Sequence, residues 1–226
     1  ADNNTAVGYQ SLKANTTGTN NTAVGSLALD ANTTGSQNTG IGVQSLSANT
    51  TAASGTAIGY AALLSNTTGC CNTGLGKSAM QTNTTGADNV AVGDSALAFN
   101  TTASNNTAIG TLALYSNTTG YNNAAVGKDA MKDNTTGHSN AVLGTSGLAN
   151  NTTGASNSSV GHGAMFDNTT GANNTAVGYL ALGDNTTANN NTAVGYDALR
   201  VNTTGAQNVA VGSSSLVTNT TGGQNT

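Results

Sequence analysis

A 17-residue unit, repeated from Asn4 almost to the end of the chain, constrains this sequence more than any other feature. The first unit reads NTAVGYQSLKANTTGTN, and the second reads NTAVGSLALDANTTGSQ. Thirteen such units fill the 226 residues, with an incomplete unit at each end. Because neither end carries an atypical capping repeat, residues 1–226 are predicted to be a single repeat array and a section of a longer fibre.

The positions of the repeat, numbered here as columns with Asn4 in column one, differ in how freely they vary. Column four is always aliphatic, column five is always glycine, column eight is Ala, Ser or Gly, and column nine is Leu or Met. Every charged or aromatic residue and both histidines fall in columns six, seven, ten, eleven, sixteen and seventeen. The restricted columns are therefore predicted to face inward and the variable ones to face solvent.

Columns four and nine carry the large apolar side chains and are predicted to form the hydrophobic core. In the first half of the chain these residues are Val7, Val24, Ile41, Ile58, Leu75, Val92, Ile109, Leu12, Leu29, Leu46, Leu63, Met80 and Leu97.

A unit of this length has room for two short strands and two turns, whereas helical repeats need about 30 residues or more. The β-branched segment NTAV and the segment around columns eight and nine are the expected strands. One unit buries too little apolar surface to fold alone, so neighbouring units must stack. These patterns predict an all-β protein, a parallel β-solenoid (β-roll) of about 13 stacked coils, with column-five glycines in turns that need a positive φ.

Charge and composition exclude several classes of function. Nine aspartates and no glutamate stand against five Lys and Arg, so no basic surface is available for nucleic acid. No apolar run approaches the roughly 18 residues of a membrane span. His138 and His162 lie in different columns without a repeated nucleophile, and no column repeats an aspartate as calcium-binding β-rolls do. We expect no enzyme, no catalytic residues, no metal site and no cofactor other than covalent glycans.

The Asn-Thr-Thr of columns twelve to fourteen is identical in all thirteen repeats, and each copy is an N-x-[ST] sequon. Two interpretations stand side by side: a line of N-linked glycans, or a ladder of asparagine amides stacked along the coils. The asparagines concerned are Asn15, Asn32, Asn49, Asn66, Asn83, Asn100, Asn117, Asn134, Asn151, Asn168, Asn185, Asn202 and Asn219.

The two threonine columns suggest an alternative function, an ice-binding β-solenoid whose stacked hydroxyls order water. Adjacent residues of an extended segment point to opposite sides, so only one of these columns is expected to be exposed. Column two is a further threonine column, but it is interrupted by Val90, Ala124, Ala141, Ser158 and Val209.

The only cysteines, Cys70 and Cys71, are neighbours in one repeat. By the same alternation their side chains are expected to diverge, which disfavours a disulfide between them. An incidental pair and an intermolecular bridge are the two remaining interpretations.

The recurring core motif, present as AVG (6–8), AIG (57–59), AIG (108–110) and AVG (193–195), resembles the head β-roll of trimeric autotransporter adhesins. The longer pattern NTAVGYxAL…NTTG is similar to repeat tracts of bacterial surface proteins and phage-type tail fibres. The resemblance implies parallel stacked coils in an extracellular or cell-surface fibre or adhesin shaft, and self-association into a fibre or homotrimer. It also implies surface glycans or a receptor as contacts. A single-chain solenoid remains open beside the trimer.

Overall fold

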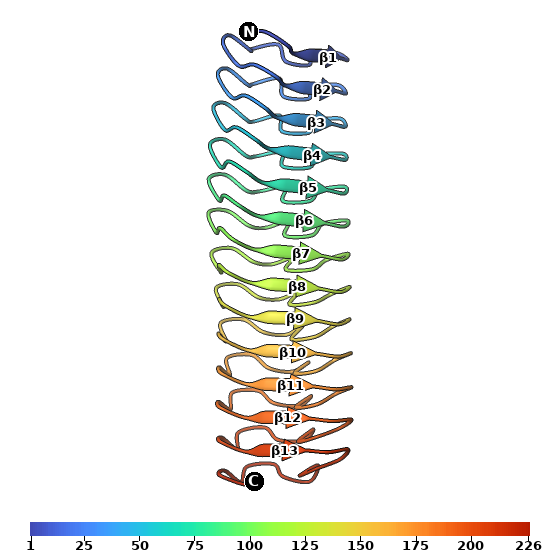
Figure 1. Ribbon diagram of the computed structural model, residues 1–226, viewed down its shortest axis with the longest axis vertical. Coiled ribbons are helices and arrows are strands. Elements are labelled where there is room, and N and C mark those ends of the chain that lie inside the picture. Colours follow the sequence, from blue (N-terminus) through green and yellow to red (C-terminus); the bar gives the residue numbers. More distant parts are fainter. The chain divides into compact units, whose positions relative to one another are not determined.

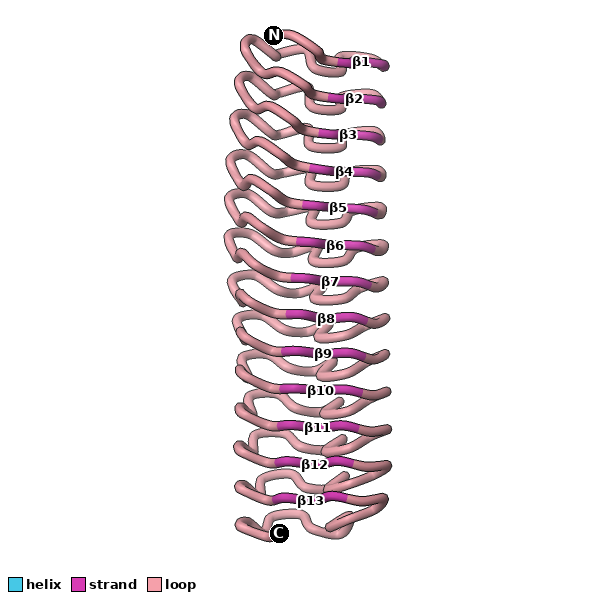
Figure 2. Tube along the Cα trace, viewed as in Figure 1, coloured by secondary structure: helices cyan, strands magenta, loops and turns pink.

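The computed structural model describes residues 1–226 and contains thirteen strands and no helix. Each repeat contributes one strand of three residues, formed by columns two to four, and turns make up the rest of the coil (Figures 1 and 2). The strands are β1 (Thr5–Val7), β2 (Thr22–Val24), β3 (Thr39–Ile41), β4 (Thr56–Ile58), β5 (Thr73–Leu75), β6 (Val90–Val92), β7 (Thr107–Ile109), β8 (Ala124–Val126), β9 (Ala141–Leu143), β10 (Ser158–Val160), β11 (Thr175–Val177), β12 (Thr192–Val194) and β13 (Val209–Val211).

The chain forms two compact units, Ala1–Leu112 and Ala113–Thr226. Within the first unit, β1 to β7 pair in sequence order as parallel strands, and β8 to β13 do the same within the second. The register matches each residue with the residue one repeat later, as in the pairing of Thr39 with Thr56. Both units are therefore parallel β-solenoids with a 17-residue coil, which confirms the predicted fold class.

The expected second strand around columns eight and nine does not form. Columns seven and nine both have left-handed backbone conformations, as in Gln44 (φ 60°) and Leu46 (φ 50°), and a strand cannot continue through them. Neighbouring coils are nevertheless hydrogen-bonded there: the N–H of Leu46 donates to the carbonyl of Ala62 at 3.0 Å. Hydrogen bonds between coils thus run around the whole coil, although only one side is a β-sheet.

Leucine and methionine in column nine fill the interior, as predicted. From Leu29 to Leu199 every residue of this column has no exposed surface, whereas Leu12, in the first coil, is half-buried. Apart from Ala6, Ser11 and Ser215 in the end coils, the small residues of columns three and eight are also buried and lie against one another. The hydroxyl of Ser159 in column three donates to the carbonyl of Ala164 in column eight at 2.6 Å. Small side chains therefore let the strand approach the opposite side of the coil.

Column four does not belong to the core, so seven of the thirteen predicted core residues were wrong. Val7, Ile41, Leu75 and Ile109 are 38 to 57% exposed, and Val24, Ile58 and Val92 are half-buried. The reason is the alternation of side chains along a strand. Column three points inward, so columns two and four on either side of it must point outward. The sequence misled because column four carries the larger, more apolar side chains while column three carries alanine.

The column-five glycines follow the strand at a sharp corner. Gly42 has a φ of +134°, and a Cβ atom on it would lie 2.3 Å from the carbonyl oxygen of Gly59 in the next coil. Both the backbone conformation and the close approach of the coils therefore require glycine, as the sequence predicted.

Candidate functional site

The asparagines of column twelve form a ladder inside the coils. The side-chain amide of Asn49 donates to Oδ1 of Asn32 in the preceding coil at 2.8 Å. The same nitrogen donates to the carbonyl of Ala52, three residues further along its own turn, at 3.1 Å. The pattern repeats with Asn83, which donates to Oδ1 of Asn66 at 2.7 Å. Both amide hydrogens are therefore used, one along the ladder and one across the turn.

A second asparagine ladder occupies column one, directly before each strand. Oδ1 of Asn21 accepts the backbone N–H of Asn38 in the next coil at 2.9 Å, and the side-chain nitrogen of Asn21 donates to the carbonyl of Gly35 at 2.9 Å. The sequence predicted column one only as the first residue of a strand, and this ladder was not expected. The available signal was its near invariance, because every complete repeat except the one at Gly55 has Asn there.

The two ladders meet at one inward-facing carbonyl in each coil. In the second coil the carbonyl of Gly35 accepts hydrogen bonds from Asn21 and from Asn32, at 2.9 and 3.0 Å. These bonds join the residue before the strand to the NTTG turn, which closes the coil. Asparagines of both ladders also form hydrogen bonds with the next coil. The same amides therefore fix both the shape of a coil and its stacking on its neighbour.

This geometry answers whether the sequon asparagines face in or out. All of the thirteen except Asn15 and Asn219 are fully enclosed, and those two are half-buried. A glycan on the side-chain nitrogen would replace a hydrogen that is already donated and would need space that the neighbouring coil occupies. The structure therefore favours the ladder over a line of glycans.

Gly55 is a natural gap in the column-one ladder. Its N–H still donates to Oδ1 of Asn38 at 2.8 Å, but glycine offers no side-chain oxygen to the N–H of Asn72 in the following coil. A Cβ atom on Gly55 would meet its nearest neighbour, Oδ1 of Asn38, at 3.1 Å. A side chain there is a tight fit that needs the amide of Asn38 to shift by a few tenths of an ångström.

The two threonines of the sequon have different environments. Thr33 in column thirteen is half-buried, and its hydroxyl donates to the carbonyl of Thr50 in the next coil at 2.9 Å. Thr34 in column fourteen is exposed. The expectation that only one of these columns faces solvent is therefore confirmed, and the hydroxyls of column thirteen are engaged in stacking the coils.

The outer face of each sheet consists of columns two and four, with a row of threonines or small residues beside an aliphatic row. In the first unit column two is threonine apart from Val90, and in the second it reads Ala124, Ala141, Ser158, Thr175, Thr192 and Val209. Ala124, Ala141 and Ser158 line a shallow apolar hollow of about 370 Å³ together with Leu143 and its neighbours. A row of exposed aliphatic side chains is unusual on the surface of a monomeric protein.

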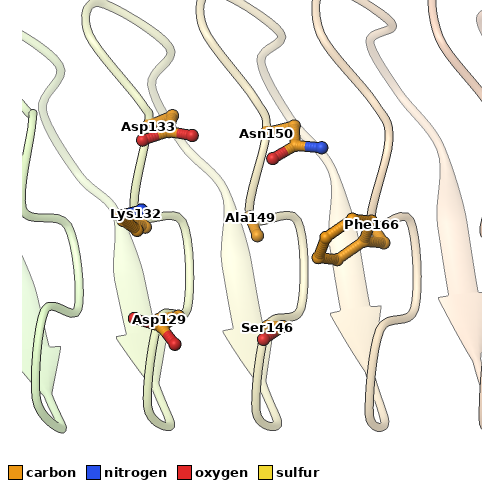
Figure 3. Close-up of a pocket in the computed structure, with 7 residues that line it drawn as sticks. All are labelled: Asp129, Lys132, Asp133, Ser146, Ala149, Asn150 and Phe166. Carbon is orange, nitrogen blue, oxygen red and sulfur yellow. The ribbon is translucent and has the colours of Figure 1, made fainter.

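The variable columns bring polar residues together on other surfaces of the second unit. Asp129, Lys132, Asp133, Asn150 and Phe166 border a hollow of about 230 Å³, shown in Figure 3. The labelled side chains come from equivalent columns of successive coils, and the hollow lies where Ala149 separates Lys132 from Phe166. The arrangement does not bring a histidine or a thiol to these carboxylates, and it repeats in no other coil.

Aromatic rings in the second unit stack along the coils. His162, Tyr179 and Tyr196 of column six form a stack with centroid separations of 5.4 Å, and Tyr121 stacks on His138 at 4.8 Å. Each histidine therefore packs against a tyrosine in the next or preceding coil, and the two histidines belong to separate stacks.

These features define the class of protein: a tandem-repeat β-solenoid whose coils are closed and stacked by buried asparagine ladders. No family model, curated protein or solved structure matches the chain. The structure holds no helix with the length and hydrophobicity needed to cross a bilayer.

Proposed function

We propose that this chain is a structural section of an extracellular or cell-surface fibre, acting as an adhesin shaft or spacer and not as an enzyme. The observation that carries the proposal is the buried asparagine and leucine interior, which recurs coil after coil within each unit. Hydrogen bonds join neighbouring coils around the whole circumference of the solenoid. Pulling two coils apart would have to break all of these bonds together, which suits a mechanical role. The charged residues, histidines and cysteines occur in variable columns, whereas the restricted columns are those that build the coil.

The partner that the surface favours is a second copy of this chain, docked through the outer face of the sheet. Leu75 and Leu143 in column four are 43 and 55% exposed, although aliphatic residues occupy this column in every repeat. Burial of these side chains between copies removes apolar surface from water at about 25 cal/mol per Å². The resemblance to trimeric adhesin heads supports association into a homotrimer or fibre, with receptor or surface-glycan contacts left to the variable columns.

Sedimentation of the purified protein tests this association. We expect an oligomer that dissociates when Leu75→Lys and Leu143→Lys are introduced together, while the thermal unfolding midpoint changes little because both positions are exposed. The control is Thr85→Lys with Thr153→Lys, which places the same charges in the exposed column fourteen and is expected to keep the oligomer. A native protein that remains monomeric at all concentrations would contradict the proposal.

We further propose that the sequon asparagines act as the ladder and carry no glycan. A measured mass equal to the 22.0 kDa polypeptide, for protein secreted from a glycosylating host, is the expected result. Added mass removed by an amidase specific for N-linked glycans would contradict it.

Ice binding is the second candidate function, and the outer face of the first unit favours it. Thr22, Thr39 and Thr56 form a row two residues before the column-four row along each strand, on the same face of a parallel sheet. Thermal hysteresis that is abolished by Thr39→Lys and Thr56→Lys, and retained with Thr34→Lys, would support this function. The absence of hysteresis and of ice shaping would exclude it.

A further inference from the structure

The hollow of about 230 Å³ in the second unit holds charges of both signs beside an aromatic ring. Lys132, Ala149 and Phe166 follow one another in column ten of three successive coils, and the buried Ala149 lies at the centre of the hollow. Asp133 and Asn150 border one end of it, as Figure 3 shows. Pockets for drug-sized molecules measure about 300–1,000 Å³, so this hollow is suited to one small ligand.

Two charged groups of this hollow have no partner inside the protein. Asp129 is already paired with Lys128 of the same coil. Lys132 and Asp133 belong to neither of the protein's ion pairs, and their side chains form no hydrogen bond. Both side chains are half-buried. The hollow therefore offers one ammonium group and one carboxylate to a ligand.

Asn150 adds a second acceptor beside Asp133. Its side-chain nitrogen donates to Oδ1 of Asp167 in the next coil at 2.9 Å, which leaves its side-chain oxygen as the free group. Asp133 and Asn150 stand in column eleven of neighbouring coils, whose backbones pair at about 4.8 Å. One ammonium group, with three N–H donors, can therefore reach both the carboxylate and the amide oxygen.

The ring of Phe166 has no ring stacked on it, although rings in one column of this protein do stack. Tyr179 and Tyr196 of column six stack with their centroids 5.4 Å apart. In column ten the coils before and after Phe166 carry Ala149 and Gly183, and the Phe166 side chain is 38% exposed. A ring placed over Ala149 would lie one coil from Phe166, within the range of favourable aromatic pairs.

We propose that this hollow binds a free aromatic α-amino acid in its zwitterionic form. The ammonium group of the ligand pairs with Asp133 and Asn150, its carboxylate pairs with Lys132, and its ring lies over Ala149 beside Phe166. A zwitterion supplies one charge of each sign. A simple cation would meet the like charge of Lys132, and a simple anion that of Asp133, so both fit the hollow less well.

Ala98 is the other alanine of column ten and provides an internal comparison. The coil before it carries Gln81 and Thr82 in the columns where the hollow has Lys132 and Asp133. Neither Gln81 nor Thr82 is charged, so we expect no amino-acid site at Ala98.

Saturation-transfer NMR with L-phenylalanine tests the proposal and is suited to a large assembly. We expect saturable transfer to the ring protons of the ligand, with half-saturation below about 10 mM. 3-Phenylpropionate lacks the ammonium group and phenethylamine lacks the carboxylate, so each should bind about fivefold more weakly through the loss of one ion pair. No saturable transfer in this range, or equal affinities for the three compounds, would overturn the proposal.

A side chain that fills the hollow should compete with the ligand. Ala149→Phe places a ring where the ring of the ligand is proposed to lie, and we expect it to abolish binding. Ala98→Phe is the matched control, because it makes the same change in the same column at an alanine that is equally buried, with 5% exposure. This control should bind as the native protein does. Undiminished binding by Ala149→Phe, or an equal loss in both variants, would overturn the proposal.

Removal of single charges tests the two ion pairs while leaving the space of the hollow open. Lys132→Gln and Asp133→Asn should each weaken binding about fivefold and leave the thermal midpoint unchanged, because neither side chain has a partner in the protein. Lys13→Gln and Asp184→Asn change the same two columns in other coils and should leave the affinity unaltered. Native affinity in both Lys132→Gln and Asp133→Asn would contradict the assignment of the site.

Discussion

Leu46 and Ile41 belong to the same coil, and both stand in columns that are aliphatic in every repeat. Leu46 is completely buried, whereas Ile41 is 38% exposed on the outer face of the sheet. The interior is shared by the leucine column and two asparagine columns, while the outer face combines aliphatic residues with threonine. Hydropathy therefore does not separate inside from outside here. The direction of each side chain does, and buried amides are accepted because the nitrogen and the oxygen of each side chain have hydrogen-bond partners.

The largest effect is expected from a charge placed in the asparagine ladder. Asn83→Asp replaces a nitrogen that donates to Asn66 and to Gly86, so a carboxylate oxygen would face two acceptors at 2.7 and 2.9 Å. We expect a loss of about 3–5 kcal/mol in the free energy of unfolding, measured by denaturant titration. Because protonation restores a donor, the pKa of the new carboxyl is raised in the folded state, and the loss should shrink as the pH falls.

The exposed Asn105 provides the matched control for this change. Asn105→Asp alters the charge equally and should change stability by less than about 0.5 kcal/mol. Equal losses for the two variants would mean that burial of the ladder does not govern its stability.

Truncation of the two aliphatic columns compares the interior and the outer face directly. Leu46→Ala should cost about 2–5 kcal/mol, because it leaves a cavity in a fully buried column. Ile41→Ala in the same coil should cost about 1 kcal/mol or less and should weaken self-association instead. Amide hydrogen exchange of this coil and sedimentation measure the two effects. A larger loss of stability for Ile41→Ala than for Leu46→Ala would mean that column four belongs to the core after all.

The contact between columns three and eight offers a compensating pair. Val142 is the largest residue of column three, and glycine stands opposite it at Gly147, where a Cβ atom would lie 2.8 Å from Cγ1 of Val142. Gly147→Ala alone should cost about 1–3 kcal/mol through overpacking. Adding Val142→Ala recreates the alanine pair of other coils and should recover most of the loss. A double-mutant cycle in thermal or denaturant unfolding measures this coupling, and strict additivity would refute it.

The smallest effect is expected where the ladder is already broken. Gly55→Asn should stabilise the first unit by about 1 kcal/mol, since it supplies the missing acceptor for Asn72 and restricts the unfolded chain. Gly55→Ala is the control, because it restricts the chain without adding the hydrogen bond. A thermal midpoint for Gly55→Asn no higher than that of Gly55→Ala would show that the gap costs nothing.

The prediction of the interior was correct for column nine and wrong for column four, and each outcome has a local cause. Column nine is large, apolar and restricted to two residue types, which is typical of a core position. Column four is also apolar and restricted, to Val, Ile and Leu, but column three beside it is mostly alanine, a side chain too small to stand out as a core position. The column-one ladder was also missed, because asparagine before a strand is common in turns and its burial depends on the carbonyl it meets.

The 17-residue period by itself determined that the chain is an all-β solenoid, because a unit too small to fold alone has to stack on copies of itself. It also determined the glycine corner, since no other residue occupies column five. Only the tertiary structure decided which side of the strand faces inward and that both asparagine columns are buried. Those features depend on left-handed residues in columns seven, nine and seventeen. Leucine disfavours that conformation, so a leucine in column nine gives no sign of it in the sequence.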